Sequence, residues 1–333
     1  MSDNTITLVW RTDVHLAVKS PSSRTDNWAD AVLDKLVQVG DIAREVGADA
    51  VIDGGDFFHI KSPSRTTHAL IQRVAEVHSA YPCPVWAVRN GNHDVKFGDG
   101  EFLDEAPLGV LFKTGVFKMI PEEGKVFTAR EHDEMHGSVI ANSVRICAVP
   151  YHGTTYDMSR LDIKKGKESH LMVAAHLLAS KAGGDMFGGE DIVKYADLVD
   201  LDPDVWCFGH WHKNQGVTEM GGKHIVNIGS LTRGALSQDD LERIPEVAII
   251  RFHEGRRVTV ERRPLKVRPA SEVFDLEGRV RELATGMTVD SFVESVKATL
   301  EKSSGASVLD DVQAMDLPGA VKERLTLLLE ESA

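Results

Sequence analysis

Residues of the types that bind metal ions recur along this 333-residue chain, each time just after a short apolar run. They are Asp13, His15, Asp56, Asn92, His176, His210 and His212. Imidazole and carboxylate donors together suit zinc, iron, manganese or nickel, whereas an all-oxygen set would indicate magnesium or calcium. We therefore expect two divalent ions that share one carboxylate, with Asp56 as the natural bridge. Two ions roughly 3.5–4 Å apart can clamp a phosphate group and lower the pKa of a bound water.

The apolar runs before these residues are typical of β-strands, and they position the expected ligands. The strands lie at 7–12, 50–55, 84–90, 171–175 and 205–209. Open α/β sheets place their ligand sites beyond the carboxyl ends of such strands. The glycines that the tight turns after the strands require are Gly54, Gly55, Gly91 and Gly209. Five strand ends are thus expected to deliver their polar side chains to one place.

Each of these motifs has a plainer interpretation when it is taken alone. A single buried histidine is more often satisfied by backbone groups than by a metal, and a lone DxH or GNHD motif is weak. Coincidence would have to place seven ligand types at five strand ends, in stretches too apolar to satisfy them. For the remaining histidines the surface interpretation is favoured; examples are His68, His78, His132, His136, His224 and His253.

Hydrophobic periodicity predicts an α/β layered fold. A helix is expected from Trp28 to Gly47, capped by Asp26 or Asn27, with Lys35 as the one polar break in its apolar stripe. A second helix is expected to be capped by Ser64 and to run through Ala80. Helical crossovers between strands imply neighbouring parallel strands. Further strands are expected at 144–150 and 224–229, followed by a hairpin over 246–267 that turns at 254–255.

The last part of the chain carries no further strand signal. Two amphipathic helical stripes lie at 289–300 and 321–328. We expect a catalytic domain over residues 1–270 and a small helical region over 271–333. Packing against the main domain is the plain interpretation of the stripes, and docking of a partner is the alternative.

Composition limits the class of protein. The chain is 42% hydrophobic, has no run of eighteen apolar residues and shows no basic leader before an apolar segment, so we expect a cytoplasmic enzyme without a membrane span. The three cysteines, at positions 83, 147 and 207, are expected to be reduced. A net charge of -13 argues against a broad basic surface that coats nucleic acid. It does not exclude a nucleic-acid enzyme, because bound cations would attract phosphate.

The order D-x-H, GGD, GNHD, an isolated histidine and GHWH over residues 13–212 resembles the calcineurin-like metallophosphoesterase superfamily. Within it, the segment GDFFH at 55–59, the PS at 63–64 and the turn NIGSLTR at 227–233 resemble the SbcD and Mre-type nucleases of double-strand-break repair. The stretch at 22–26 is similar to a compact, phage-like branch. The resemblance implies a layered sandwich of two mixed sheets flanked by helices.

The resemblance also implies roles for individual residues. Asp13, His15, Asp56 and His212 would hold the first metal, and Asp56, Asn92, His176 and His210 the second. His93 would be catalytic, contacting the scissile phosphate and assisting departure of the leaving oxygen, with Asp94 orienting its ring. His59 matches a second histidine beside the cleft.

Partners follow from the same resemblance: manganese, DNA, a second copy of the chain, and a coiled-coil ATPase of the SbcC or Rad type. The implied activity is a DNA exonuclease or endonuclease of repair, recombination or replication.

Two departures and one alternative accompany this resemblance. Thr12 stands where a serine is usual and Ala17 where a glycine is frequent, and neither is expected to touch a ligand. The alternative is a nucleotide or small-molecule phosphodiesterase, because the same core serves several substrates. Two basic stretches, 160–167 and 251–268, are candidates for contact with DNA.

Overall fold

A computed structural model describes residues 4–59, 65–96, 100–133, 137–183, 189–235 and 237–275. The compact unit that contains the site ends at Phe274. The helical stripes expected after residue 275, the expected cap Ser64 and His136 lie outside the described residues. Among the helices of the described part, none is long and apolar enough to cross a membrane.

The first sheet has six strands in the order β14-β13-β1-β2-β3-β4. Strands β1 to β4 are mutually parallel, and β13 pairs antiparallel with β1. The parallel strands are those joined by crossovers, as the sequence predicted. Their bounds are β1 Ile6–Arg11, β2 Ala50–Asp53, β3 Val85–Ala87, β4 Phe117–Met119, β13 Glu246–Phe252 and β14 Val258–Pro264.

The second sheet has six strands in the order β11-β12-β10-β7-β6-β5. Its centre is parallel, and β5 and β11 pair antiparallel at its two edges. A small sheet of β8 Ala179–Ser180 and β9 Val193–Lys194 lies apart from it. The bounds of the six strands are β5 Lys125–Asp133, β6 Gly137–Val149, β7 His170–His176, β10 Val205–Gly209, β11 Gly216–Met220 and β12 Lys223–Asn227.

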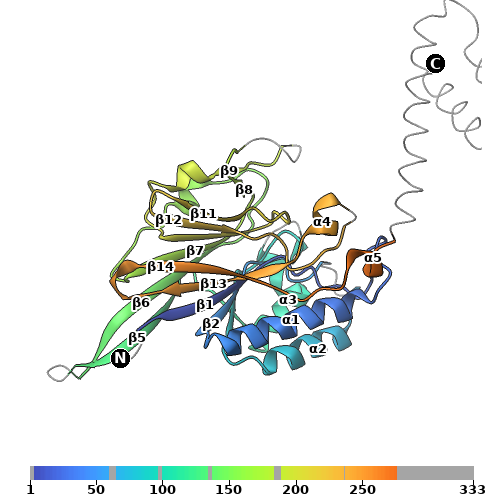
Figure 1. The fold of residues 1–333 in the computed structure, drawn as a ribbon, viewed down its shortest axis with the longest axis horizontal. Helices are drawn as coiled ribbons and strands as arrows, with labels where there is room; N and C mark the ends of the chain where they lie inside the picture. Colours follow the sequence, from blue (N-terminus) through green and yellow to red (C-terminus); the bar gives the residue numbers. More distant parts are fainter. Residues whose placement is uncertain are drawn as a thin grey trace, which may run out of the picture. The chain divides into compact units, whose positions relative to one another are not determined.

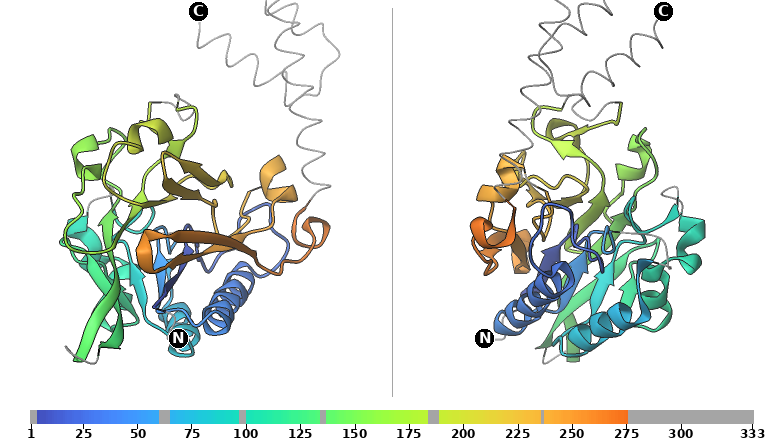
Figure 2. Two further views of the ribbon diagram at one scale, coloured as in Figure 1. Left: turned by 60° about the vertical axis from the view of Figure 1, so that its left-hand side comes forward. Right: turned by 90° about the vertical axis from the view of Figure 1, so that its right-hand side faces the viewer.

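Alternation along the strands places the sheets face to face with helices outside. Leu8 and Trp10 of β1 share a buried cluster with Met172 and Cys207 of the second sheet, whereas Val9 packs with the helices. Figures 1 and 2 show α1 and α2 together on the outer side of the first sheet. The expected sandwich of two mixed sheets flanked by helices is confirmed. The α-helices are α1 Trp28–Glu45, α2 His68–Ser79, α3 Pro107–Lys113, α4 Gln238–Glu242 and α5 Ala270–Val273.

Helix caps explain where the two long helices begin. The Asn27 side chain accepts from the Asp30 amide at the start of α1, so Asn27 rather than Asp26 is the cap. Helix α2 begins at His68, with Thr67 as its cap. This cap lies three residues beyond the expected cap Ser64.

One histidine that was interpreted as a surface residue is buried. His78 of α2 lies 3.0 Å from the Arg11 guanidinium, and Arg11 in turn donates to Asp53 at 2.8 Å. Burial, together with the charge of Arg11, lowers the pKa of His78. This neutral imidazole and the Arg11–Asp53 pair connect α2 to the first two strands.

Candidate metal centre

The carboxyl ends of five strands meet at one edge of the sandwich and carry the predicted ligands. The ligand-bearing turns follow β1, β2, β3, β7 and β10. The turns are tied to each other by backbone hydrogen bonds, including Asp13 N to Gly55 O at 3.1 Å and His15 N to Asp56 O at 3.0 Å. The predicted convergence of these side chains is what the structure shows.

The first group of donors consists of Asp13, His15, Asp56 and His212, whose ligand atoms lie within 4.8 Å of one another. The Nε2 atoms of His15 and His212 approach to 2.8 Å. Each of them lies 3.7–3.8 Å from Asp13 Oδ1. Four donor atoms that face one point in this way can hold a single cation.

The second group consists of Asp56, His176 and His210, again within 4.8 Å. Asp56 Oδ1 accepts from the His93 amide at 2.8 Å. Its other oxygen, Oδ2, lies 3.7 Å from His15 Nε2 and 3.3 Å from His176 Nε2, so Asp56 faces both groups. This geometry supports Asp56 as the shared carboxylate.

Three buried atoms test whether these residues suit metal ions. Asp56 Oδ2, Asn92 Oδ1 and His176 Nε2 are buried and make no hydrogen bond in the structure. A buried polar atom without a partner costs about 1–3 kcal/mol, so such atoms need an explanation. All three belong to the predicted ligand set, and a cation would satisfy them. The residues therefore fit the two ions.

Neighbouring side chains fix which imidazole nitrogen is available to a metal. His176 Nδ1 lies 2.8 Å from the Gly54 carbonyl and must donate to it, which leaves Nε2 as the ligand atom. His210 Nε2 lies 2.9 Å from Glu190 Oε1, which leaves Nδ1. Tyr156 donates to the same Glu190 oxygen at 2.7 Å. Glu190 and Tyr156 were not predicted from the sequence, since neither follows a strand that carries a ligand.

Charge at the site keeps the two central carboxyl groups ionised. Burial alone would raise the pKa of Asp13 and Asp56, but the imidazoles around them outweigh burial and lower both. Burial and the neighbouring His212 lower the pKa of His15 to about 4, so its ring is neutral. Burial would lower the pKa of His176, yet Asp56 raises it to about 10. A metal ion at Nε2 must displace that proton.

His93 and His59 lie together beside the first group. Their rings stack with centroids 5.1 Å apart, and the His93 ring is 4.9 Å from that of His15. His93 Nδ1 lies 3.0 Å from the His59 carbonyl and must donate to it, so Nε2 is the nitrogen that can exchange a proton. His59 Nδ1 faces His15 Nδ1 at 3.3 Å.

Asp94 does not orient the His93 ring, and this expectation was wrong. Both Asp94 oxygens accept backbone N–H groups instead: Asp56 and Gly91 at 2.8 Å, and Phe57 and Phe58 at 3.0 and 3.2 Å. Burial and the nearby Asp56 raise the pKa of Asp94 to about 7. Asp94 holds the turns after β2 and β3 against each other, and the His59 carbonyl orients the His93 ring.

Thr12 is the second correction. Its hydroxyl donates to Asp13 Oδ2 at 2.8 Å, so this residue does touch a ligand. Serine and threonine share that hydroxyl, which explains why the exchange is compatible with the site.

Close approach explains two of the glycines. A Cβ at Gly91 would lie 2.1 Å from Asp56 Oδ1, and one at Gly209 would lie 2.2 Å from Thr12 Oγ1. Any side chain at either position would displace a ligand or the residue that holds it.

Comparison with known proteins places the chain in a family. A profile of calcineurin-like phosphoesterases matches residues 7–214, which include every predicted ligand and His93. The chain belongs to the calcineurin-like phosphoesterase family. This family of metallophosphoesterases uses two divalent ions, in agreement with the two donor groups found in the structure.

Individual relatives of this phosphoesterase are distant. Double-strand break repair protein mus-23 of Neurospora crassa is 24% identical over 322 residues, covering 80% of this chain and 40% of that protein. The phosphoesterase therefore spans less than half of that relative's length. The calcineurin-like phosphoesterase YfkN of Bacillus subtilis has a similar structure, with a TM-score of 0.50 and 12% identity over 81% of this chain and 95% of that one. This second likeness supports the fold.

Proposed function

We propose that this phosphoesterase is a metal-dependent DNA nuclease that hydrolyses phosphodiester bonds in DNA repair, recombination or replication. The observation that carries the proposal is the similarity to mus-23, a double-strand break repair protein, across 80% of the chain. The motifs at 55–59 and 227–233, which resemble the SbcD and Mre-type nucleases, support the same substrate class.

Asp13, His15, Asp56 and His212 would hold the first ion, and Asp56, Asn92, His176 and His210 the second. Such ions bind phosphate oxygens and activate a water molecule for attack. The mixture of imidazole and carboxylate donors favours manganese over magnesium. Glu190 and the Gly54 carbonyl orient His210 and His176 so that one nitrogen of each faces the ions.

His93 is the residue that donates a proton to the leaving oxygen. Its Nδ1–H is fixed on the His59 carbonyl, and its ring lies against the first donor group. Protonated Nε2 can therefore donate to an oxygen that departs from a phosphate held between the two groups. His59 acts as a positioning residue, because its carbonyl aims the His93 ring.

Four basic residues of the two stretches expected to touch DNA are paired with carboxylates in the structure. Lys164 and Lys165 pair with Asp162 and Asp204 at 2.6 Å. Arg262 and Arg263 pair with Glu246 and Glu45 at 2.6 and 2.8 Å. Contact with DNA is better assigned to a cleft of about 390 Å³ beside His15, His59 and His212, which Lys19 also lines.

We extend the proposal to partners on the basis of the resemblance. A homodimer and a coiled-coil ATPase of the SbcC or Rad type would work with the nuclease. The amphipathic stripes after residue 275 are the proposed docking segment for the ATPase.

The deciding experiment compares substrates with manganese present. Duplex and single-stranded DNA, bis-p-nitrophenyl phosphate and cyclic nucleotides are offered to the wild-type protein and to His93→Ala. We expect DNA hydrolysis that falls at least about 10²-fold in His93→Ala while both metals are retained. Hydrolysis of cyclic nucleotides without DNA hydrolysis would overturn the proposal, and loss of a metal in His93→Ala would make His93 a ligand.

A further inference from the structure

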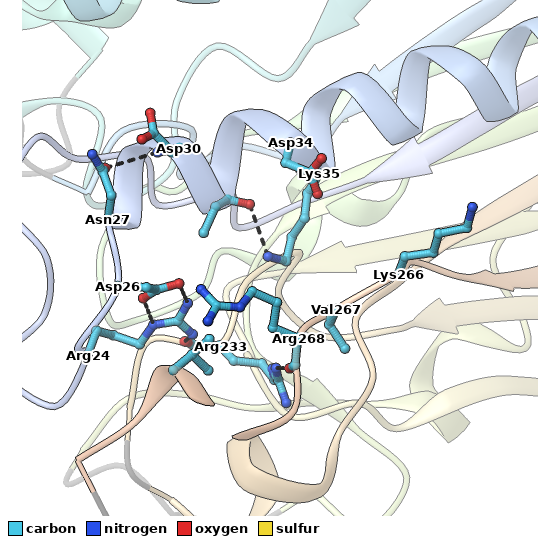
Figure 3. Close-up of a pocket in the computed structure, with 12 residues that line it drawn as sticks. Arg24, Asp26, Asn27, Asp30, Asp34, Lys35, Arg233, Lys266, Val267 and Arg268 are labelled. Atoms are coloured by element: carbon cyan, nitrogen blue, oxygen red, sulfur yellow. Dashed lines mark hydrogen bonds and ion pairs between the residues drawn. The ribbon is translucent and has the colours of Figure 1, made fainter. Parts of the chain in front are cut away.

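A second pocket lies between helix α1, the loop before it and the segment that leads into α5. Its volume is about 330 Å³. Figure 3 shows Lys35 reaching from α1 towards the side where Arg24, Arg233 and Arg268 lie. The residues that line it include five cations (Arg24, Lys35, Arg233, Lys266 and Arg268) and three carboxylates (Asp26, Asp30 and Asp34).

Lys35 is the polar break in the apolar stripe of α1, and it is 93% buried, with 7% of its surface exposed. Its ammonium group donates to the Ala31 carbonyl at 3.1 Å. Within the described part of the chain, no carboxylate lies at ion-pair distance from Lys35. A buried ammonium without a counter-charge is costly, and an apolar residue at this position would suit the stripe better.

Arg233, which lines the same pocket, is a second buried cation. It is 95% buried, with 5% exposed, and its guanidinium donates to the Arg268 carbonyl at 2.6 Å. The ion pairs found among the described residues do not include Arg233. Burial and the nearby Arg24 lower its pKa.

Among the described residues, the pocket's carboxylates form no ion pair with Lys35 or Arg233. Asp26 pairs with Arg24 through two contacts of 2.7 and 2.8 Å. Asp30 pairs with Arg73, which lies outside the pocket lining. Among the described residues, the two buried cations Lys35 and Arg233 therefore lack an ion-pair partner, in a chain whose net charge is -13.

We propose that this pocket binds a phosphate group of the polynucleotide strand, one or more nucleotides away from the phosphate at the metal centre. Guanidinium groups beside an ammonium are the usual recognition elements for phosphate oxygens. The volume lies at the lower end of the range for ligand pockets and exceeds what a single small ion needs. This inference rests on the proposed nuclease function, because it assigns a second contact to the same substrate.

The loops next to the pocket connect it to the metal centre. Ser20, Pro21, Trp28 and Gly234 line the cleft beside His15 and His212. The neighbouring Arg24, Asp26, Asn27 and Arg233 line the second pocket. The same two loops thus form walls of both, so a strand that leaves the cleft across them reaches the cations.

The test is binding of a fluorescent single-stranded oligonucleotide, followed by anisotropy, which does not require hydrolysis. Lys35→Met and Lys266→Met are compared with Lys113→Met, which changes an exposed lysine of α3. We expect Kd to rise about 5–10-fold in Lys35→Met and in Lys266→Met, with a salt slope that is smaller by about one, and no change in Lys113→Met. Equal affinity in all three variants would overturn the inference.

A second arm separates a strand phosphate from a free anion. Inorganic phosphate is titrated against protein whose lysines carry ¹³C-methyl groups, and the Lys35 signal is followed with and without the oligonucleotide. A shift of Lys35 by the oligonucleotide at concentrations near its Kd supports the inference. A shift by inorganic phosphate with no effect of the oligonucleotide contradicts it and assigns a free-anion site.

These measurements distinguish a failure of the nuclease proposal from a failure of the pocket inference. If the wild-type protein binds the oligonucleotide through Lys35 but does not hydrolyse DNA, the nuclease proposal fails and the pocket stands. If DNA is hydrolysed but Lys35→Met binds as tightly as Lys113→Met, the pocket inference fails alone.

Discussion

At the scale of single residues, the metal centre is built from backbone conformations that side chains rarely adopt. Asp13, His15, Asp56 and His210 have φ values of 52°, 49°, 52° and 85°. Each such conformation costs of order 1–3 kcal/mol and persists only where the surroundings impose it. Here the imposing contacts are the cross-turn hydrogen bonds, among them His210 N to Asp13 Oδ2 at 3.0 Å. Five non-glycine residues of the described part have a positive φ; four of them are these predicted ligands, and the fifth, Arg256, lies in the turn between β13 and β14.

Glu190 offers the most specific residue-scale prediction. Glu190→Gln keeps the size of the side chain but removes the charge that aims His210, so affinity for the second ion should fall about 10–100-fold. The measurement is a manganese titration by calorimetry. Glu76→Gln, a change of an exposed glutamate on α2, is the matched control. Unchanged affinity in Glu190→Gln would show that His210 needs no such support.

The sequence predicted the metal ligands better than the residues that hold and orient these ligands. Asp13 and Asp56 follow apolar strands and His176 ends one, and such positions are easily recognised. Glu190 lies 20 positions from His210 and follows no ligand-bearing strand, so only the folded chain brings the two together. The role of Asp94 was also beyond the sequence, because its four partners are backbone amides that no side-chain pattern reveals.

At the scale of elements, the buried strands and the hairpin that contains the edge strand β14 were predicted well, whereas several short or partly buried strands were missed. Strands β1, β7 and β10 are buried along their whole length and appear as continuous apolar runs. Strand β11 is only partly buried and has the polar sequence GVTEM, which gives no alternation to detect. The three-residue β4 and the two-residue β8 are too short for a periodic signal.

The turn after β3 gives an element-scale prediction. Gly91→Ala would place a methyl group 2.1 Å from Asp56 Oδ1, so the turn must move away from the shared carboxylate. We expect manganese affinity and hydrolysis both to fall at least about tenfold, since a small misplacement of a catalytic group is costly. Gly166→Ala is the control, because this glycine is exposed, lies outside the metal centre and the cleft, and its added atom meets only the end of the Glu168 side chain. Equal activity of the two variants would contradict the close packing at Gly91.

Lys35 of helix α1 makes the stability of the folded state depend on pH. Burial, followed by the charges of Arg24 and Arg233, lowers the pKa of Lys35 from 10.5 to about 8. The folded state therefore binds this proton more weakly than the unfolded state, and protonation destabilises the fold below about pH 8. That penalty disappears as the pH rises from about 8 towards 10.5.

Lys35→Met should accordingly raise the free energy of unfolding at pH 7 by roughly 1–3 kcal/mol. Urea unfolding at pH 7 and pH 10 measures this, and the gain should shrink at the higher pH. A variant that is less stable than wild type at pH 7 would mean that the ammonium group is well compensated in the free protein.

At the scale of the whole molecule, the compact unit that contains the metal centre extends to Phe274. Val273 and Phe274 are buried, and Phe274 forms an isolated β-bridge with Arg24. The Arg24 guanidinium also lies 4.9 Å from the Phe274 ring centroid. The segment up to residue 274 is therefore part of the catalytic unit, beyond the expected boundary at residue 270.

Two truncated chains distinguish the packing of Val273 and Phe274 from the proposed docking of an ATPase by the residues after 275. A chain that ends at Asp275 should keep its hydrolysis of bis-p-nitrophenyl phosphate and should not co-purify with a coiled-coil ATPase of the proposed type. A chain that ends at Pro269 loses Val273 and Phe274 and should be less stable by at least about 2 kcal/mol. Normal ATPase binding by the first truncation would refute the docking segment.

The number of ions per chain tests the central claim most directly. After equilibrium dialysis against manganese, elemental analysis of the wild-type protein should give two ions per chain. Asp56→Asn keeps the side-chain size and the oxygen that accepts from the His93 amide, but removes the shared charge, so it should lose at least one ion and its hydrolysis. A single ion in the wild type, or two ions with full activity in Asp56→Asn, would contradict a two-metal centre bridged by Asp56.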